Sequence, residues 1–274
     1  MLRPDVIDLR EFYNSRLGLA VRRILRQRLR AIWPDLQGLR VLGLGYATPY
    51  LRIFETETER VLAAMPAQQG VSRWPRGKPG RVMLVEEGEL PLPDSSVDRI
   101  LLVHALENSD AVREMLREVW RVLTPQGRIL AVVPNRRGLW AHIESTPFGQ
   151  GRPYTPPQLT HLMRDSGFSP LQAQSALWLP PWDRGFVLRA AAAWERTGEW
   201  LWSRFSGVLL LEAEKQVYGV TPLKPQRARQ RSFVMRPQVA NRAARQAANR
   251  AAISLTETFP EALQPGPGHG IKTP

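Results

Sequence analysis

The chain alternates short hydrophobic runs with longer stretches that mix hydrophobic and polar residues. Seven runs have the length and composition of buried strands: residues 39–44, 60–65, 82–86, 98–104, 128–134, 171–179 and 208–215. Helical spacing of hydrophobic residues predicts helices at residues 48–59, 111–123, 155–165 and 189–205. Nearly continuous hydrophobic strands separated by helix-length segments are typical of a parallel sheet buried between helices. The pattern therefore predicts a doubly wound α/β fold.

Residues 8–33 precede the first strand and read as an amphipathic helix, with arginines between the hydrophobic positions. Asn14, Ser15 and Gly18 predict a break near its start, and Pro34 ends the pattern. We expect the helix to pack on the domain, with its arginines in solvent. A helix that binds a membrane surface or nucleic acid is the alternative.

Composition excludes several classes of function. The 274 residues are 43% hydrophobic, enough for a globular core, and contain no cysteine, which excludes disulfides, thiolate metal sites and a cysteine nucleophile. The four histidines lack the spacing of metal ligands, so we expect no metal. Neither a signal peptide nor an apolar run of about 18 residues is present, which predicts a soluble cytoplasmic protein without a transmembrane segment.

The formal net charge of +13 is unevenly distributed along the chain. Residues 222–274 hold nine Lys/Arg and two acids, are rich in alanine, glutamine and proline, and are expected to be a disordered basic tail. The expected organisation is a helical segment at 1–37, a Rossmann-like domain at 38–221 and the tail at 222–274. The tail is either inert in solvent or makes weak contacts with a polyanion, which would be RNA, DNA or anionic lipid.

Several strands end in residues that suit a ligand site. Gly43 and Gly45 lie at the end of the first strand, Glu86 and Glu87 at the end of the third, and His104 ends the fourth. Right-handed crossovers bring the carboxyl ends of parallel strands to one edge, where ligands bind. Glycines before a helix let backbone N–H groups approach an anionic or carboxylate-bearing ligand. An ordinary turn between strand and helix remains the alternative for the two glycines.

Three stretches, residues 41–49, 86–98 and 121–127, resemble the class I S-adenosylmethionine-dependent methyltransferases, type 11 group. They read VLGLGYATP, EEGELPLPDSSVD and RVLTPQG. Over residues 8–220 the resemblance implies a seven-stranded Rossmann-like sheet with an antiparallel last strand, S-adenosyl-L-methionine as cofactor, and methyl transfer to an unidentified acceptor. It implies no obligatory catalytic residue. The cofactor-binding residues that it implies are Gly43, Gly45, Tyr46, Ala47, Thr48, Glu86, Glu87 and His104.

The chain departs from the family pattern at several positions. Ala47 and Pro49 stand where the first motif of the family usually has glycines. Gly43 and Met65-Pro66 stand where the family usually has acids that bind the methionyl amino group and the ribose. An inactive scaffold with a methyltransferase fold is therefore a second hypothesis, and a nucleotide-dependent oxidoreductase with an incomplete G-x-G-x-x-G is a third.

Other side chains are given roles that stay open. His104 is expected to be structural, with a base or a cofactor contact as the alternative. Trp194, Trp200 and Trp202 are expected in the core, with an aromatic acceptor pocket as the alternative. Four residues after the fifth strand are expected to face the acceptor: Asn135, Arg137, Trp140 and Tyr154.

Overall fold

A computed structural model describes residues 3–217, which contain one seven-stranded sheet in the order β3-β2-β1-β4-β5-β7-β6. The strands are β1 (Arg40–Gly45), β2 (Arg60–Pro66), β3 (Val82–Val85), β4 (Val97–Val103), β5 (Leu123–Pro134), β6 (Phe168–Ala176) and β7 (Val208–Lys215). β7 is antiparallel to both of its neighbours, while the other pairs are parallel. The predicted Rossmann-like fold class is confirmed. The strand order reverses between β1 and β4, so a ligand is expected at their carboxyl ends.

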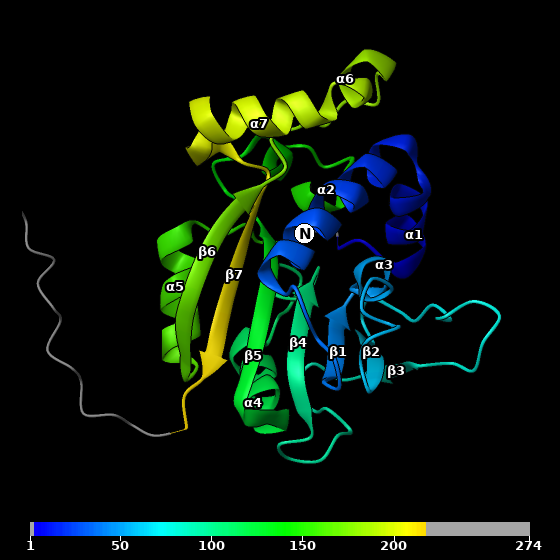
Figure 1. The fold of residues 1–274 in the computed structure, drawn as a ribbon, viewed down its shortest axis with the longest axis vertical. Coiled ribbons are helices and arrows are strands. Elements are labelled where there is room, and N and C mark those ends of the chain that lie inside the picture. The colour runs from blue at the N-terminus through cyan, green and yellow to red at the C-terminus, as the bar shows by residue number, and fades with distance from the viewer. Residues whose placement is uncertain (1–2, 218–274) are drawn as a thin grey trace, which may run out of the picture. The chain divides into compact units, whose positions relative to one another are not determined.

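Helices cover both faces of the sheet (Figure 1). α1 (Val6–Asn14), α2 (Arg16–Ile32) and α3 (Thr48–Leu51) contribute to one hydrophobic cluster, while α4 (Val112–Val122) and α5 (Pro156–Asp165) contribute to the other. The remaining elements are η1 (Leu139–His142), η2 (Pro147–Gly149), α6 (Gly185–Arg189), α7 (Ala191–Leu201) and η3 (Ser203–Phe205). The N-terminal helices therefore share a core with the sheet.

The predicted break in the N-terminal helix lies at Ser15. Its side chain accepts a hydrogen bond from the Gly18 N–H at 3.0 Å and so caps α2. Two arginines of α2 differ from the expectation of a solvated face, whereas Arg23 is exposed as expected. Arg26 donates to the Pro49 carbonyl, and Arg30 pairs with Glu57 at 2.6 Å. Both are partly buried, because α2 lies against the segment that follows β1.

The predicted helix at residues 48–59 is wrong in length, since α3 ends at Leu51. Tight i→i+3 hydrogen bonds follow, among them Phe54 N–H to the Leu51 carbonyl at 3.0 Å. Phe54 is fully buried, and the Thr58 hydroxyl bonds back to the Phe54 carbonyl. These local bonds replace the helical ladder and lead the chain into β2.

Two of the stretches that carry the family resemblance contact each other through Arg121. Its guanidinium donates to the Leu90 and Leu92 carbonyls, each at 2.9 Å, and pairs with Asp94 and Glu118. The hydrogen bond with Glu118, followed by that with Asp94, raises the pKa of Arg121 above its ordinary value. Arg121 therefore holds the turn before β4 against helix α4, so the contact between these two stretches is structural.

The last third of the described chain differs from prediction in detail. β6 begins at Phe168, three residues before the predicted strand, and the predicted helix at 189–205 is divided into α6, α7 and η3. Trp194 packs partly against the core, but Trp200 and Trp202 are exposed, so their predicted core position is wrong. The predicted basic tail, 222–274, lies outside the described residues.

Candidate functional site

The glycine loop, which is formed by Gly43 and Gly45 at the end of β1 and by the residues that follow, is closely packed against β4. Gly45 has φ +82°, and a Cβ there would lie 2.3 Å from the Val103 carbonyl oxygen. The next residue, Tyr46, donates its N–H to the same oxygen at 2.8 Å. A Cβ on Gly43 would meet Ala47 and Leu51 at 2.7 Å. Both glycines are therefore required by the packing of the loop itself.

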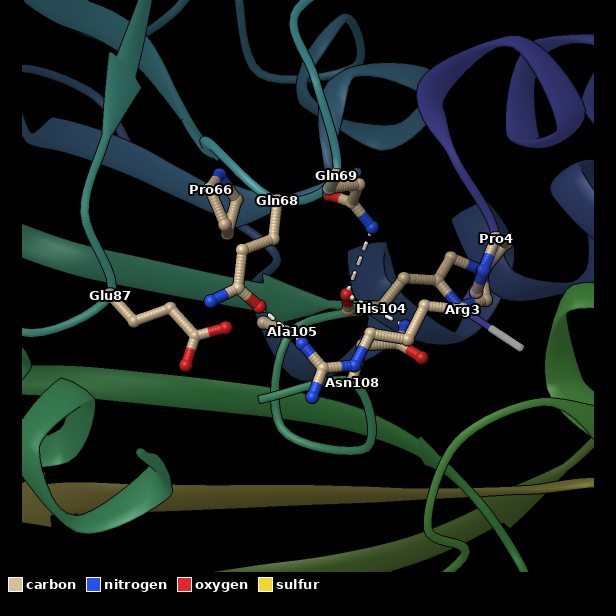
Figure 2. A pocket seen from close by; sticks show the side chains of 9 residues that line it. All are labelled: Arg3, Pro4, Pro66, Gln68, Gln69, Glu87, His104, Ala105 and Asn108. Atoms are coloured by element: carbon tan, nitrogen blue, oxygen red, sulfur yellow. Dashed lines mark hydrogen bonds between the residues drawn. The ribbon is translucent and has the colours of Figure 1, made fainter. Parts of the chain in front are cut away.

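The carboxyl ends of β2, β3 and β4 surround a small cavity of about 10 Å³, shown in Figure 2. It is lined by Arg3, Pro4, Pro66, Gln68, Gln69, Glu87, His104, Ala105 and Asn108. Figure 2 shows the Glu87 side chain reaching from the end of β3 toward Gln68 and Arg3. A cavity of this volume has room for about one water molecule.

The walls of this cavity are rich in hydrogen-bond acceptors. Glu87 accepts from the Ser109 hydroxyl at 2.5 Å and from the Ala111 N–H at 3.2 Å. Gln69 and Asn108 both donate their side-chain amides to the His104 carbonyl, at 3.2 and 3.1 Å. Within residues 3–217, three buried oxygens around His104 have no hydrogen-bond partner: Gln69 Oε1, Glu107 Oε2 and Asn108 Oδ1. Buried acceptors without a partner are costly, so they indicate a place for donors.

A buried chain of hydrogen bonds runs beside the cavity, from Glu107 through His104 and Tyr13 to Tyr50. Glu107 Oε1 lies 3.1 Å from His104 Nδ1, and His104 Nε2 lies 2.8 Å from the Tyr13 hydroxyl, to which Tyr50 donates at 3.0 Å. Since the Tyr13 oxygen accepts from Tyr50, its own proton goes to His104 Nε2. The His104 proton then lies on Nδ1 and is donated to the carboxylate of Glu107.

This chain links helix α1 to the end of β4. Burial raises the pKa of the Tyr13 hydroxyl well above its usual value, and burial likewise raises that of Tyr50. Both hydroxyls therefore stay protonated at neutral pH. The Tyr13 ring also stacks on Tyr46 of the glycine loop at a centroid distance of 5.7 Å. His104 has φ +52°, a strained conformation for a residue with a side chain, and such strain clusters at functional sites.

The N-terminal segment closes the cavity. Arg3 contacts the side chains of Gln68 and Asp110, Pro4 lines the wall, and the Val6 N–H donates to the Gln69 carbonyl at 2.8 Å. On the other side of α1 lies an open cleft of about 580 Å³, lined among others by Phe12, Pro147 and Pro4. Pro4 is therefore a wall that the cavity and the cleft share.

The structure brings only part of the predicted site to the cavity. Glu87 and His104 line it, whereas Glu86 is exposed and forms a bridge with Glu89. Five predicted residues form the packed loop beside it and are not among its lining residues: Gly43, Gly45, Tyr46, Ala47 and Thr48. With only four residues, α3 is also too short to supply the helix N-terminus expected after this loop.

The residues expected on the acceptor side have structural contacts. Asn135 donates to the Ser206 carbonyl at 2.9 Å, and the Trp140 indole donates to the Leu179 carbonyl at 2.7 Å. Tyr154 donates to the Leu106 carbonyl at 3.3 Å. Asn135 and Trp140 are buried, so these side chains hold the long segment after β5 in place.

Several lining residues were missed by sequence reasoning. Gln68 and Gln69 come shortly after Pro66, the last residue of β2, so the rule that ligands bind at strand ends could have found them. Arg3, which lines the cavity, and Tyr13, which bonds to the lining residue His104, lie far from the strand ends in sequence, and no local pattern marks them.

Residues 41–131 match the model of a family described as a methyltransferase domain. This segment is a methyltransferase domain. The fold of the chain resembles two solved structures with TM-scores above 0.5. An S-adenosylmethionine-dependent methyltransferase from Archaeoglobus fulgidus is 20% identical with a TM-score of 0.54, covering 75% of this chain and 96% of that one. Another from Mesorhizobium loti is 16% identical with a TM-score of 0.51, covering 74% and 100%. No curated protein matches the sequence.

Proposed function

We propose that the protein is an S-adenosylmethionine-dependent methyltransferase whose cofactor binds at the carboxyl ends of β2, β3 and β4. The observation that carries the proposal is the set of buried acceptors at this edge of a methyltransferase domain. The adenine amino group, the ribose hydroxyls and the methionyl ammonium group of the cofactor are donors. Glu87, Gln69 and Asn108 offer acceptors for them, with Gln68 and Gln69 standing in for the acid missing after β2.

The hydrogen-bonding groups that line the cavity fit this cofactor. The cavity itself is too small for it, so part of the lining has to move. Pockets for ligands of this size measure about 300 Å³ or more, compared with about 10 Å³ for the cavity. Arg3 and Pro4 fill the missing space, so they have to move aside when the cofactor enters. Moving Pro4 also joins the cavity to the cleft beyond α1, which gives donor and acceptor one continuous space.

When bound, the cofactor supplies a methyl group on a sulfonium sulfur. The residues of this chain then contribute by holding the cofactor and the acceptor in the geometry for transfer. The acceptors of β2, β3 and β4 orient the cofactor, and the closing of α1 over the edge of the sheet excludes water. No side chain has to remove a proton unless the acceptor carries one. His104, a buried residue that lines the cavity and whose Nε2 accepts from Tyr13, is the side chain we propose for that step.

Calorimetry of the full chain with S-adenosylmethionine and with S-adenosylhomocysteine tests the proposal. We expect saturable binding of both, with a rise in thermal unfolding temperature. Absence of both heat and thermal shift at millimolar ligand would contradict it. That result would favour an inactive scaffold, the alternative supported by the closed cavity and by Pro66 in place of a ribose-binding acid.

The adjacent glutamates provide a matched pair of variants for the site. Glu87→Gln removes the charge from a carboxylate that faces the cavity, and we expect cofactor affinity to fall about tenfold. Glu86→Gln changes an exposed residue next to it and should leave affinity unchanged. The measurement is the dissociation constant of each variant. Equal affinities for both variants would show that the cofactor does not reach Glu87.

A further inference from the structure

Exposed aromatic side chains gather in one segment, residues 182–205, which we call the aromatic ledge. Within residues 3–217, every exposed tryptophan and phenylalanine lies there. Trp200 is 82% exposed and Phe186 is 63% exposed. The hydrophobic side chains of the ledge that are more than half exposed are Trp182, Phe186, Trp200, Leu201, Trp202 and Phe205. A concentration of this kind marks an interaction surface, whereas single exposed leucines elsewhere do not.

Two glutamates of the ledge, Glu195 and Glu199, attach it to the rest of the domain, while its aromatic residues stay exposed. Glu195 accepts hydrogen bonds from the backbone N–H groups of Leu177, Trp178 and Leu179, at distances of 2.7 to 3.1 Å. Glu199 pairs with Arg28 of α2 at 2.6 Å. Figure 1 shows α6 and α7 lying beyond the ends of β6 and β7. Phe186 and Trp200 therefore lie on helices whose position on the domain is set, and Trp182 and Trp202 lie in the segments that adjoin these helices.

The charges of the ledge favour an anionic partner. Arg184, Arg189, Arg196 and Arg204 are exposed and make no ion pair with any residue among 3–217. The ledge contains three acidic residues, and none of them pairs with these arginines. Glu195 accepts backbone hydrogen bonds, Glu199 pairs with Arg28, and Asp183 lies 3.9 Å from Arg16. The ledge thus combines exposed aromatic rings with exposed arginines whose charge is not compensated locally.

We propose that the aromatic ledge docks the protein on the surface of an anionic lipid bilayer. Tryptophan and phenylalanine rings insert at the level of the lipid headgroups, where apolar and polar surroundings meet, and arginines attract acidic headgroups. The formal net charge of +13 adds to the attraction. The part of the chain that the structure describes has no helix suited to crossing a bilayer. The inference does not depend on methyl transfer.

Co-sedimentation of the full chain with vesicles tests the docking. We expect binding to vesicles of phosphatidylcholine mixed with phosphatidylglycerol, and much weaker binding to phosphatidylcholine alone. Trp200→Ser combined with Trp202→Ser should weaken binding to the mixed vesicles on the order of tenfold. The matched control is Leu84→Ser with Leu171→Ser, which removes two exposed hydrophobic residues outside the ledge and should leave binding unchanged.

A second set of variants separates charge from insertion. Replacing Arg184, Arg189, Arg196 and Arg204 by glutamine should weaken binding at low salt, and the loss should shrink as salt rises. Arg113→Gln with Arg117→Gln, on the exposed side of α4, is the control. If the ledge variants and the controls bind alike, the proposal is overturned and basic residues elsewhere carry any lipid binding. If no vesicle binds but the tryptophan variant abolishes self-association, the ledge is instead an interface between copies of the chain.

Discussion

Replacing Gly45 with alanine is expected to lower the free energy of unfolding by about 2–5 kcal/mol. Two costs add at this position. The backbone has φ +82°, which disfavours any residue with a Cβ, and that Cβ would lie 2.3 Å from the Val103 carbonyl oxygen. The strand β4 cannot move away easily, because it pairs with β1 and β5 on either side. Chemical denaturation of the full chain measures the change.

Gly38→Ala is the matched control for this prediction. Gly38 has φ +70°, but a Cβ there meets nothing within 4 Å, so only the backbone cost of about 1–2 kcal/mol applies. The difference between the two variants isolates the collision with β4. If Gly45→Ala proves as stable as Gly38→Ala yet does not bind cofactor, the glycine serves the approach of the ligand and our assignment of a packing role is wrong.

The strands could be predicted because buried strands appear in the sequence as short, nearly continuous hydrophobic runs. β7 coincides with the predicted residues 208–215, since its hydrophobic run is bounded on both sides by polar or small residues. The end of β6 was harder to predict. Leu177 and Leu179 look like strand residues, but their backbone N–H groups bond to the carboxylate of Glu195, which is distant in sequence. A local sequence pattern cannot predict a hydrogen-bond partner this far away in the chain.

The candidate site was predictable only where it depends on strand ends. Glu87 and His104 were found because they follow hydrophobic strands whose carboxyl ends had to converge. Tyr13 reaches the same edge from helix α1, and its place depends on how that helix packs. The exposure of Trp200 has the same origin, since helical spacing shows which residues share a face but not what covers that face.

Removing the hydroxyl of Tyr13 is expected to loosen the segment that closes the cavity. In Tyr13→Phe, His104 Nε2 loses its donor and the Tyr50 hydroxyl loses its acceptor, both in a buried place. We expect stability to fall by about 2–4 kcal/mol and amide hydrogen exchange in α1 to accelerate. Faster association and dissociation of the cofactor should accompany this change, because Arg3 and Pro4 precede the same helix.

Tyr50→Phe is the control, since it keeps the bond between Tyr13 and His104 and should cost about 1 kcal/mol. The dependence of stability on pH provides an independent test. The unfolded chain releases tyrosine protons near pH 10, whereas burial raises the pKa of Tyr13 in the folded chain, so the folded state keeps its proton. Stability should therefore fall as pH rises above about 10, and less steeply in Tyr13→Phe than in the parent protein. If Tyr13→Phe matches Tyr50→Phe in stability and in amide exchange of α1, the Tyr13 hydroxyl does not hold α1 over the site.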